Sequence, residues 1–342
     1  MGDFSNSYQW DEGKEEEKKR EKPISDHPFS DIIKPHERKK SGDSVHAYMQ
    51  ILAFAQDIFE KGKQNQPVPG SEIFHRINEL IDNVQLSDKV FLELIAEDST
   101  KQTYRARHIA NVCILSIEIG GELNFNKSRL CELAVGAFLH DIGISRIAEL
   151  EAEERKFTKE ELEKVRQHPR YGLEIVSKMK DLNNNNIYCT VGQHHERLDG
   201  TGYPNAIKDG AICEYAQIVG ILDMYEAMTH WRPYRERMSS FEAMKSLMST
   251  GATHLEPRYV EALINVIGLY PVGSWVELNT GEIAKVIEIN KKRPLRPTVS
   301  IIYDAKGTKF AESRPIDIST HPIVYIKKVL TDGEMRSRFP DT

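Results

Sequence analysis

The apolar side chains of this chain follow two different periods, and the change between them sets the fold class. From Val45 to Tyr270 they recur at spacings of three and four, as on one face of an α-helix. Pro271 and Gly273 interrupt that pattern. Beyond them the apolar residues alternate with the period of two that β-strands have. The sequence therefore predicts a mainly α protein with a small β module near its C-terminal end.

The two periods and the polar ends divide the chain into five segments. Residues 1–44 carry alternating acidic and basic blocks and little apolar surface, so they predict a mobile tail or a loose helix. Residues 45–97 predict a helical N-terminal region, and residues 98–270 a larger helical domain. We expect residues 271–332 to form a small β barrel of about five strands, since short alternating segments separated by turns are typical of one. Residues 333–342 are predicted to be a second tail.

Helices and strands can be placed within these segments. Apolar spacing predicts the helices Tyr104–Ile119, Lys127–His140, Lys159–Met179, Ile187–His195, Tyr215–Met228, Phe241–Ser249 and Pro257–Ile267. Alternation predicts the strands Ser274–Leu278, Ile283–Ile289, Thr298–Tyr303 and Ile323–Val329.

Charge and cysteine usage narrow the function classes. A net charge of -6 gives no global positive field for nucleic acid or an anionic membrane. No apolar run approaches the roughly 20 residues of a membrane helix, and MGDFSNSYQW does not resemble a signal peptide. We therefore expect a cytoplasmic protein that does not bind DNA or RNA and does not insert into a membrane. The four cysteines are Cys113, Cys131, Cys189 and Cys213. They form no CxxC pair, which argues against a thiolate zinc site. Their scatter in apolar surroundings fits a reducing compartment.

Histidines and aspartates gather in short motifs within the larger helical domain. Ligands of these two types without cysteine suit manganese, iron or zinc in a hydrolytic site. Neighbours on a helix point about 100° apart, so an adjacent His-Asp pair can address one metal with the histidine and bridge two with the carboxylate. Two cations bridged in this way could share a hydroxide and polarise a phosphoryl oxygen. A lone histidine is more often a packed core residue, so the inference rests on the set: His108, His140-Asp141, His168, His194-His195 and Asp223.

The residues and the order of these motifs resemble those of the HD-GYP family, a branch of the HD phosphohydrolase superfamily. The resemblance covers roughly residues 99–270, and its most specific part is HHERLDGTGYP, His194 to Pro204. FLHDIG, QHPRYG and RPYR follow in the expected order. The resemblance implies a helical HD-type bundle, two divalent metal ions that are iron or manganese, and hydrolysis of a cyclic dinucleotide, most often cyclic di-GMP.

The resemblance also implies a role for each member of the set. A first ion would be held by His108, His140, Asp141 and Asp223. Asp141 would bridge to a second ion, completed by His168, His194 and His195, and His140 and Asp141 would be the catalytic pair. Some relatives hold a third ion through a glutamate at the position of Tyr104, and a tyrosine is a poor ligand for a hard metal. We therefore expect a two-metal site.

Substrate contacts are implied beside the metals. Arg232 and Arg235 match positions that contact substrate phosphates, and guanidinium forks suit phosphate oxygens. Surface ion pairs with nearby glutamates are the alternative for both. Tyr203 and Gly202 are expected to shape the mouth of the site, although a purely structural role for this loop is equally compatible. Asp199 is expected either to orient a metal-bound histidine or to cap a turn.

The chain departs from the family pattern at two positions. Ile144 stands where a lysine usually follows HDIG, so a positive charge near the phosphate is missing. Glu226 stands where an aspartate is usual. Both changes leave the metal ligands intact and bear on turnover and substrate preference. In the β module, a basic turn is expected to be a solvated loop, with a docking surface as the alternative: Lys291, Lys292, Arg293 and Arg296.

The sequence thus predicts a metal-dependent phosphodiesterase that cleaves a cyclic dinucleotide, with cyclic di-GMP as the expected substrate, by means of a hydroxide that bridges two metals. One alternative is a weak or inactive cyclic di-GMP receptor that signals to a protein partner. A second is an HD enzyme for other phosphate esters, and a third is a helical domain whose histidines only pack. The N-terminal helices could also pair two copies into a homodimer.

Overall fold

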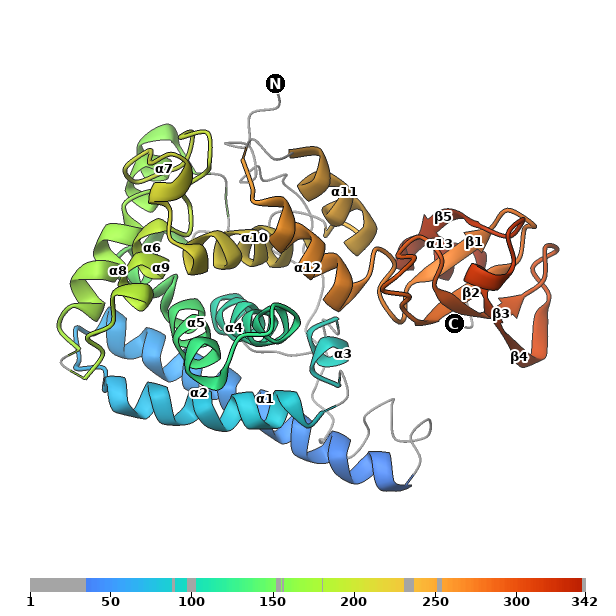
Figure 1. Ribbon diagram of the computed structural model, residues 1–342, viewed down its shortest axis with the longest axis horizontal. Coiled ribbons are helices and arrows are strands. Elements are labelled where there is room, and N and C mark those ends of the chain that lie inside the picture. The colour runs from blue at the N-terminus through green and yellow to red at the C-terminus, as the bar shows by residue number, and fades with distance from the viewer. Residues whose placement is uncertain are drawn as a thin grey trace.

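The computed structural model of the protein consists of a helical part and a β-sheet that lies at one end of the molecule (Figure 1). Helices extend to Ile267 and strands begin at Trp275, at the point where the sequence period changes. The mainly α fold class is confirmed. No helix among the described residues is both long and apolar enough to cross a lipid bilayer. The structure describes residues 35–87, 90–96, 103–151, 155, 157–179, 181–230, 237–250 and 254–339.

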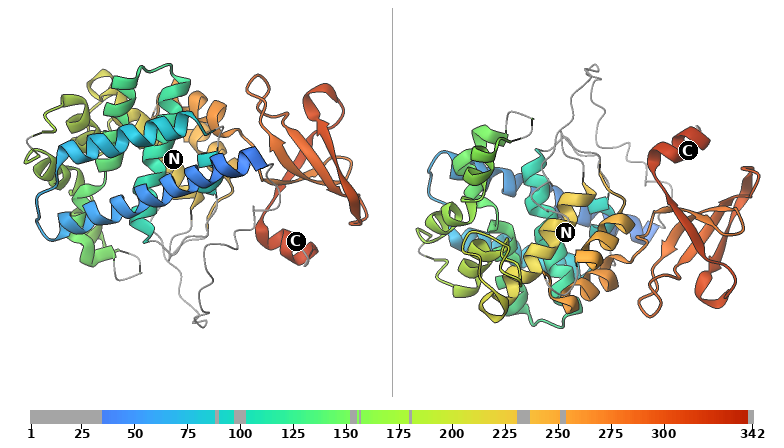
Figure 2. Two further views of the ribbon diagram at one scale, coloured as in Figure 1. Left: turned by 90° about the horizontal axis from the view of Figure 1, so that it is seen from below. Right: turned by 90° about the horizontal axis from the view of Figure 1, so that it is seen from above.

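Two long helices cover one face of the helical part. Helix α1, Pro35–Lys63, and helix α2, Gly70–Gln85, lie side by side and pack on α4, Tyr104–Glu122, and α5, Lys127–Leu139 (Figure 2). Helix α1 begins inside the segment that the sequence predicts as a tail, and residues 1–34 of that segment lie outside the described residues. The short helix α3, Val90–Ala96, contacts α1 and α4. The buried face of α1 is the one predicted by apolar spacing: Tyr48, Ile51, Leu52, Ala55 and Ile58.

Helices α4 and α10, Glu214–Thr229, form the centre of the helical part. They contact each other, and both are buried on most sides (Figure 1). Helices that are apolar nearly all round belong in a protein interior, which explains why neither has a strongly polar face. Their few buried polar residues therefore stand out. His108 on α4 and Asp223 on α10 are among them.

One predicted helix is two helices in the structure. The sequence predicts Lys159–Met179, but α7 covers Lys159–Val165 and α8 covers His168–Val176. The break follows from Pro169, which has no backbone N–H to donate to the carbonyl of Val165, four residues earlier. That carbonyl instead accepts a hydrogen bond from Nδ1 of His168, at 2.7 Å. The proline thus ends one helix and fixes a histidine at the start of the next.

Shorter elements complete the helical part. The 3-10 helix η2 follows the His140-Asp141 pair and leads into α6, while α11 and α12 pack against α10 or each other. Their bounds are η2 Ile142–Ile147, α6 Ala148–Glu151, α9 Asn185–Gln193, η3 Asp209–Ala211, α11 Ser240–Thr250 and α12 Pro257–Ile267.

The C-terminal module is an open antiparallel sheet of five strands, so the prediction of a closed barrel is wrong. The strand order is β4-β3-β2-β1-β5, and β4 and β5 are edges that do not pair with each other. The sequence does not predict β4, whose KFAESRPID is polar and mostly exposed. It contains Pro315, and prolines occur in sheets at edges. The strands are β1 Trp275–Leu278, β2 Ile283–Glu288, β3 Thr298–Tyr303, β4 Lys309–Asp317 and β5 Ile326–Leu330.

The C-terminal segment is helical where the sequence predicts a tail. Helix α13, Asp332–Arg338, starts at a capping box in which Thr331 and Glu334 bond each other's backbone N–H groups. Its Met335 is buried in a small cluster with residues of the sheet. The residue pattern T-x-x-E before this helix is the signal that sequence reasoning overlooked.

The basic turn between β2 and β3 has mainly structural contacts. Arg296 donates hydrogen bonds to the backbone carbonyls of four residues that lead into β5, and Arg293 donates to the carbonyl of Ser319. Lys291 forms an ion pair of 2.6 Å with Glu122 at the end of α4. These contacts hold the turn against its neighbours.

Candidate metal centre

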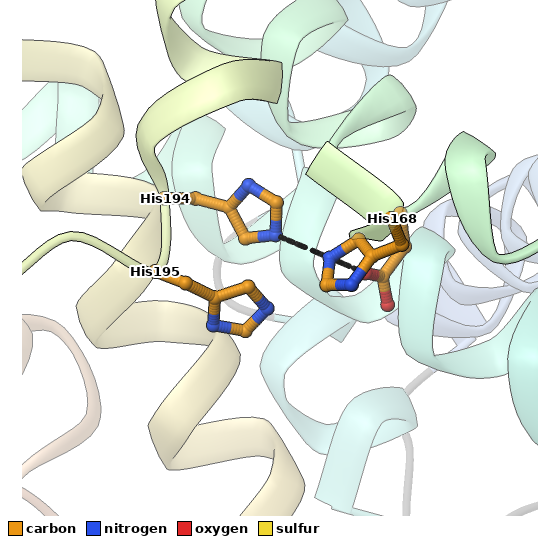
Figure 3. Close-up of side chains that lie close together, drawn as sticks. His168, His194 and His195 are labelled. Carbon is orange, nitrogen blue, oxygen red and sulfur yellow. Dashed lines mark hydrogen bonds and ion pairs between the residues drawn. The ribbon is translucent and has the colours of Figure 1, made fainter. Parts of the chain in front are cut away.

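The seven residues that the sequence singles out as metal ligands come together in the helical part. Their ligand atoms form two groups in which all atoms lie within 4.8 Å of one another. The seven residues come from five places in the chain: α4, the end of α5, the start of α8, the end of α9 and the middle of α10. Figure 3 shows three of the histidines pointing toward one another. The groups are His108, His140 and Asp223, and Asp141, His168, His194 and His195.

The carboxylate of Asp141 lies between the two groups. Its Oδ2 is 3.4 Å from Nε2 of His108 and 3.4 Å from Nε2 of His140. Its Oδ1 is 3.2 Å from Nε2 of His168 and 3.8 Å from Nε2 of His194. One oxygen therefore faces each group, which is the arrangement that a bridging carboxylate requires.

Asp223 makes a second link between the groups. Its Oδ1 is 3.2 Å from Nε2 of His108, and its Oδ2 is 3.7 Å from Nδ1 of His195. Both residues that contact it are themselves in one of the two groups. The centre is therefore a single connected cluster with little exposure to solvent.

Three histidines are oriented by their own backbone. Each donates its Nδ1–H to the carbonyl oxygen of the residue three positions earlier, which leaves the lone pair of Nε2 directed at the centre. These bonds follow from the position of each histidine at a helix end, where carbonyls lack intrahelical partners. They join His140 to Ala137 at 2.6 Å, His168 to Val165 at 2.7 Å, and His194 to Val191 at 3.1 Å.

The Nε2 atoms face one another in pairs. Those of His108 and His140 are 3.3 Å apart. Those of His168 and His194 are 3.2 Å apart, and a dashed line joins them in Figure 3. Two lone pairs at such distances repel unless a proton or a cation lies near both. Burial lowers the pKa of His194 to about 4 and holds the pKa of His195 well below its usual value, so protons are disfavoured on this side. The donor set therefore fits a divalent cation in each group.

His108 is oriented by a carboxylate that the sequence analysis treats only as a departure from the family pattern. Its Nδ1 donates to Oε2 of Glu226 at 2.5 Å. The other oxygen of Glu226 accepts from the side-chain amide of Asn111 at 3.0 Å, and Asn111 accepts from the hydroxyl of Tyr48 at 2.8 Å. A carboxylate behind a histidine fixes the ring and raises its basicity as a ligand. The spacing of Glu226, one helical turn after Asp223, could have indicated this role.

The charge of the first group favours a cation. Burial alone would lower the pKa of His108, but the carboxylates of Glu226, Asp141 and Asp223 outweigh it and hold that pKa well above its usual value. Burial likewise opposes ionisation of Asp141 and Asp223, yet the histidines around both, and Arg105 beside Asp141, hold the pKa of each well below its usual value. The group thus holds ionised carboxylates and attracts positive charge.

Gly143 explains how His168 reaches Asp141. A Cβ atom on Gly143 would lie 1.9 Å from the carbonyl oxygen of His168, so only glycine lets η2 approach the start of α8 this closely. The contact places the residues that follow Asp141 directly against α8. The glycine of HDIG is therefore part of what assembles the second group.

The loop after His195 packs over the second group. The ring of Tyr203 stacks on the ring of His195 with their centroids 4.5 Å apart, and the Tyr203 N–H donates to the His195 carbonyl at 3.2 Å. Gly202 has no room for a side chain, since a Cβ there would lie 2.4 Å from Cα of Glu196. Glu196 is buried and accepts from the backbone N–H groups of Asn205 and Ile207, at 2.8 and 3.0 Å. Glu196 therefore holds this loop in place, a role that no motif in the sequence predicts.

Other candidates lie outside the two groups. Asp199 accepts hydrogen bonds from the N–H and hydroxyl of Thr201 and pairs with His254, which agrees with the turn-capping alternative. His230 bonds the carbonyl of Ile95 through Nε2 at 2.8 Å and belongs to neither group. Arg232 and Arg235 lie outside the described residues.

A disulfide bond joins two elements that carry ligands. Cys189 on α9 is bonded to Cys213 at the N-cap of α10, whereas Cys113 and Cys131 are free and buried. The scatter of the cysteines predicts a reducing compartment, and the disulfide departs from that prediction because residues 24 positions apart give no local signal of pairing. The bond ties the helix before His194 to the helix that carries Asp223.

Two family models match the chain. The HD domain matches residues 89–259, and the KOW domain associated with HD domain matches residues 275–338. The first range contains all seven ligand residues, and the second contains the whole sheet and α13.

Characterised proteins resemble the chain over these regions. The cyclic di-GMP phosphodiesterase PdeB of Borreliella burgdorferi is 26% identical over 320 residues, which are 93% of this chain and 84% of the relative. The 3'3'-cGAMP-specific phosphodiesterase 3 of Vibrio cholerae is 27% identical over 190 residues, 54% of this chain and 41% of the relative. Among solved structures, the HDG"Y"P protein Bd1817 of Bdellovibrio bacteriovorus matches with a TM-score of 0.50 at 18% identity, over 70% of this chain and 73% of that one.

Proposed function

This chain belongs to the HD domain family, in its HD-GYP branch, and from that premise we propose that it is a cyclic di-GMP phosphodiesterase that uses two metal ions. The coarser statement, a metal-dependent hydrolase of cyclic dinucleotides, follows from the relatives and from the His/Asp cluster. The substrate and the number of metals are the finer part of the proposal.

The position of Asp141 carries the proposal. One of its oxygens faces each group of ligands, and the histidines around it direct lone pairs at two separate points. Histidines that only packed would place neutral, partnered nitrogens in the core instead. The hard and borderline donors fit iron or manganese, and the absence of cysteine among them argues against a soft metal.

The chain's own residues divide the work of hydrolysis. When bound, two divalent ions would supply an activated water nucleophile and charge neutralisation at the scissile phosphate. The carboxylate of Asp141 ties the two groups at a fixed separation. Glu226 and the backbone carbonyls hold the imidazole rings in the ligating tautomer. Burial of the cluster keeps bulk water from screening these charges.

Cyclic di-GMP is the favoured substrate because PdeB, whose name gives that activity, matches 93% of this chain. The relatives named for 3'3'-cGAMP match about half of the chain. A mixed dinucleotide therefore remains the comparison substrate for the test.

Product analysis tests the proposal. The full chain is purified anaerobically, loaded with manganese or ferrous iron, and incubated with cyclic di-GMP or 3'3'-cGAMP, and the products are separated by chromatography. We expect a linear dinucleotide or mononucleotides from cyclic di-GMP, and a loss of at least about a thousandfold in Asp141→Asn. The exposed Asp57→Asn on α1 is the matched control and should keep full activity. An Asp141→Asn protein as active as its parent would rule out the bridging role.

The second candidate function is a receptor that binds the dinucleotide without cleaving it. It is favoured by Ile144, which is 4% exposed and offers an apolar side chain directly after HDIG. Calorimetry on the same metal-loaded protein separates the two. Tight binding of cyclic di-GMP with no product would support the receptor.

A further inference from the structure

Arg105 lies next to the bridging carboxylate. It sits on α4 one helical turn before His108, and its Nη1 forms an ion pair with Oδ2 of Asp141. The same oxygen faces the group formed by His108, His140 and Asp223. The Arg105 side chain is 13% exposed, so it is mostly buried beside the centre and is partly accessible to solvent.

Arg105 is held in this place by a second contact. Its guanidinium carbon lies 5.4 Å from the centroid of the Tyr104 ring, a cation–π distance. The guanidinium remains charged at every accessible pH and presents several N–H donors in one plane. A fixed planar cation at the edge of a phosphodiester site has the chemistry to bind a phosphate oxygen.

Other cations near the centre have different hydrogen-bond partners. Arg197 is partly buried, and although the charge of Asp223 acts on it, it donates to the backbone carbonyls of His194 and Glu196, at 3.0 and 2.8 Å. The guanidinium of Arg166 lies over the ring of Tyr203. Ile144 contributes no charge. Within the described part of the chain, Arg105 is the arginine or lysine that pairs with a carboxylate of the two ligand groups.

We propose that Arg105 is a phosphate-binding residue, whose guanidinium leaves Asp141 for a non-bridging oxygen of the substrate when metal is bound. Two cations cannot share Oδ2 of Asp141 without mutual repulsion, so metal binding weakens the ion pair seen here. The substrate phosphate must lie against both ligand groups, which places an anion beside the released guanidinium. This inference rests on the proposed function and adds a cation to its site that the family motifs do not contain.

A different role for Arg105 makes the opposite prediction. If the residue only neutralises Asp141 in the metal-free protein, its removal relieves competition at Oδ2. Metal would then bind more tightly, and phosphate binding to the metal-loaded protein would not change.

Binding of inorganic phosphate to the manganese-loaded full chain tests the proposal without requiring turnover. Calorimetry is performed on the parent, Arg105→Met and Arg105→Lys, with the metal content of each sample measured. Methionine preserves the packing of the stem, and lysine keeps the charge without the fork. The matched control is Arg146→Met on η2, whose guanidinium donates to Oδ1 of Asn65 and pairs with no ligand residue among the described contacts.

We expect phosphate to bind at least about tenfold more weakly to Arg105→Met at unchanged metal content, since a hydrogen bond to a charged group is lost. Arg105→Lys should be intermediate and Arg146→Met unchanged. The kcat/KM for cyclic di-GMP should fall by a similar factor in Arg105→Met.

Equal phosphate affinity in the parent and Arg105→Met, with both fully loaded, would overturn the proposal. If both Arg105 variants lose metal or fail to fold, the residue is structural and the proposal also fails. A parent that binds phosphate through Arg105 but cleaves no cyclic dinucleotide would sink the proposed function and leave this inference standing.

Discussion

Individual side chains in this protein act mainly by orienting one another. The Nδ1 atoms of His108, His140, His168 and His194 are all occupied by hydrogen bonds that point away from the centre. These bonds fix the orientation of each ring, and the Nε2 lone pair is therefore directed at the centre. Three of these bonds use backbone oxygens and survive any side-chain substitution, whereas that of His108 depends on Glu226.

Glu226→Gln should therefore weaken the first group selectively. A glutamate has two acceptor oxygens, one for His108 and one for Asn111. A glutamine has one oxygen and one NH2 group, so its NH2 group would face one of these two donors. We expect metal affinity to fall by about 10–100-fold, as for other partners of ligating histidines. Metal titration followed by elemental analysis measures the change. Glu214→Gln, on the same helix but paired with Arg129 and Arg258, is the control and should bind metal as the parent does.

Gly143→Ala tests whether the contact between η2 and α8 assembles the second group. The added methyl would meet the carbonyl oxygen of His168, and backbone must move to accommodate it. We expect a loss of roughly 1–3 kcal/mol in the free energy of unfolding, together with weaker metal binding. Gly121→Ala on α4, where a Cβ meets nothing within 4 Å, is the control and should lose neither stability nor metal. Equal unfolding midpoints for the two variants would contradict this account.

The metal-free protein should lose stability as the pH falls from about 6.5 to 4. Burial lowers the pKa of His194 to about 4, so within this range the unfolded chain binds a proton that the folded chain does not. Unfolding then takes up protons, and the free energy of unfolding decreases as pH falls, by at most about 1.4 kcal/mol per pH unit for each such group. His194→Asn should reduce that slope in denaturant titrations of chelated protein. An unchanged slope would show that other groups dominate.

The ends of helices, more than their middles, build the metal centre of the helical part. The start of α8, the end of α9 and the N-cap of α10 each supply a ligand or hold one in place. Helix ends carry free carbonyls and N–H groups, which is why they can bind the histidines of the centre. The disulfide between Cys189 and Cys213 acts at this level, because it links α9 to α10.

Removing the disulfide should destabilise the oxidised protein. It closes a loop across a sequence separation of 24 residues, for which chain entropy predicts about 3 kcal/mol. The variant with both Cys189→Ser and Cys213→Ser should unfold at lower denaturant than the parent in the absence of reductant. Dithiothreitol should shift the parent toward the variant and leave the variant unchanged. If reductant shifts both equally, the disulfide is not the cause.

The molecule as a whole combines a helical part that encloses the His/Asp cluster with a sheet that has its own small apolar cluster. Residues of β1, β2 and β3 extend the main core, while Ile283, Tyr303, Leu330 and Met335 form a separate one. A cavity of about 930 Å³ lies where the two parts meet, lined by residues of α3, α10, α12, β1, β2 and β5. The metal centre lies in the helical part alone.

Metal removal should consequently lower the stability of the helical part and leave that of the sheet unchanged. Binding to the native state alone stabilises it by an amount that grows with the ratio of free metal to Kd. After chelation we expect faster amide hydrogen exchange in α4, α8, α9 and α10, and unchanged exchange in β2 and β3. Hydrogen-exchange mass spectrometry with and without manganese measures both. Equal acceleration in the sheet would show that the centre stabilises the two parts as one unit.

Much of this structure could be read from local patterns. Apolar spacing gave the buried face of α1 and the position of the change from helices to strands, because each depends on neighbours a few residues away. The open sheet could not be read in the same way. Whether β4 and β5 pair is decided by their separation in space, and the polar sequence of β4 gives no strong signal by itself.

By itself, the sequence determined which residue types were available to hold metal, and where a proline would end a helix. Pro169 acts through backbone geometry that follows from its own chemistry. The tertiary structure alone decided that Glu226 would support His108, that Arg105 would meet Asp141 and that Cys189 would bond Cys213. These pairings join residues 24 to 118 positions apart, so they depend on how whole helices pack and leave no mark in any short stretch of sequence.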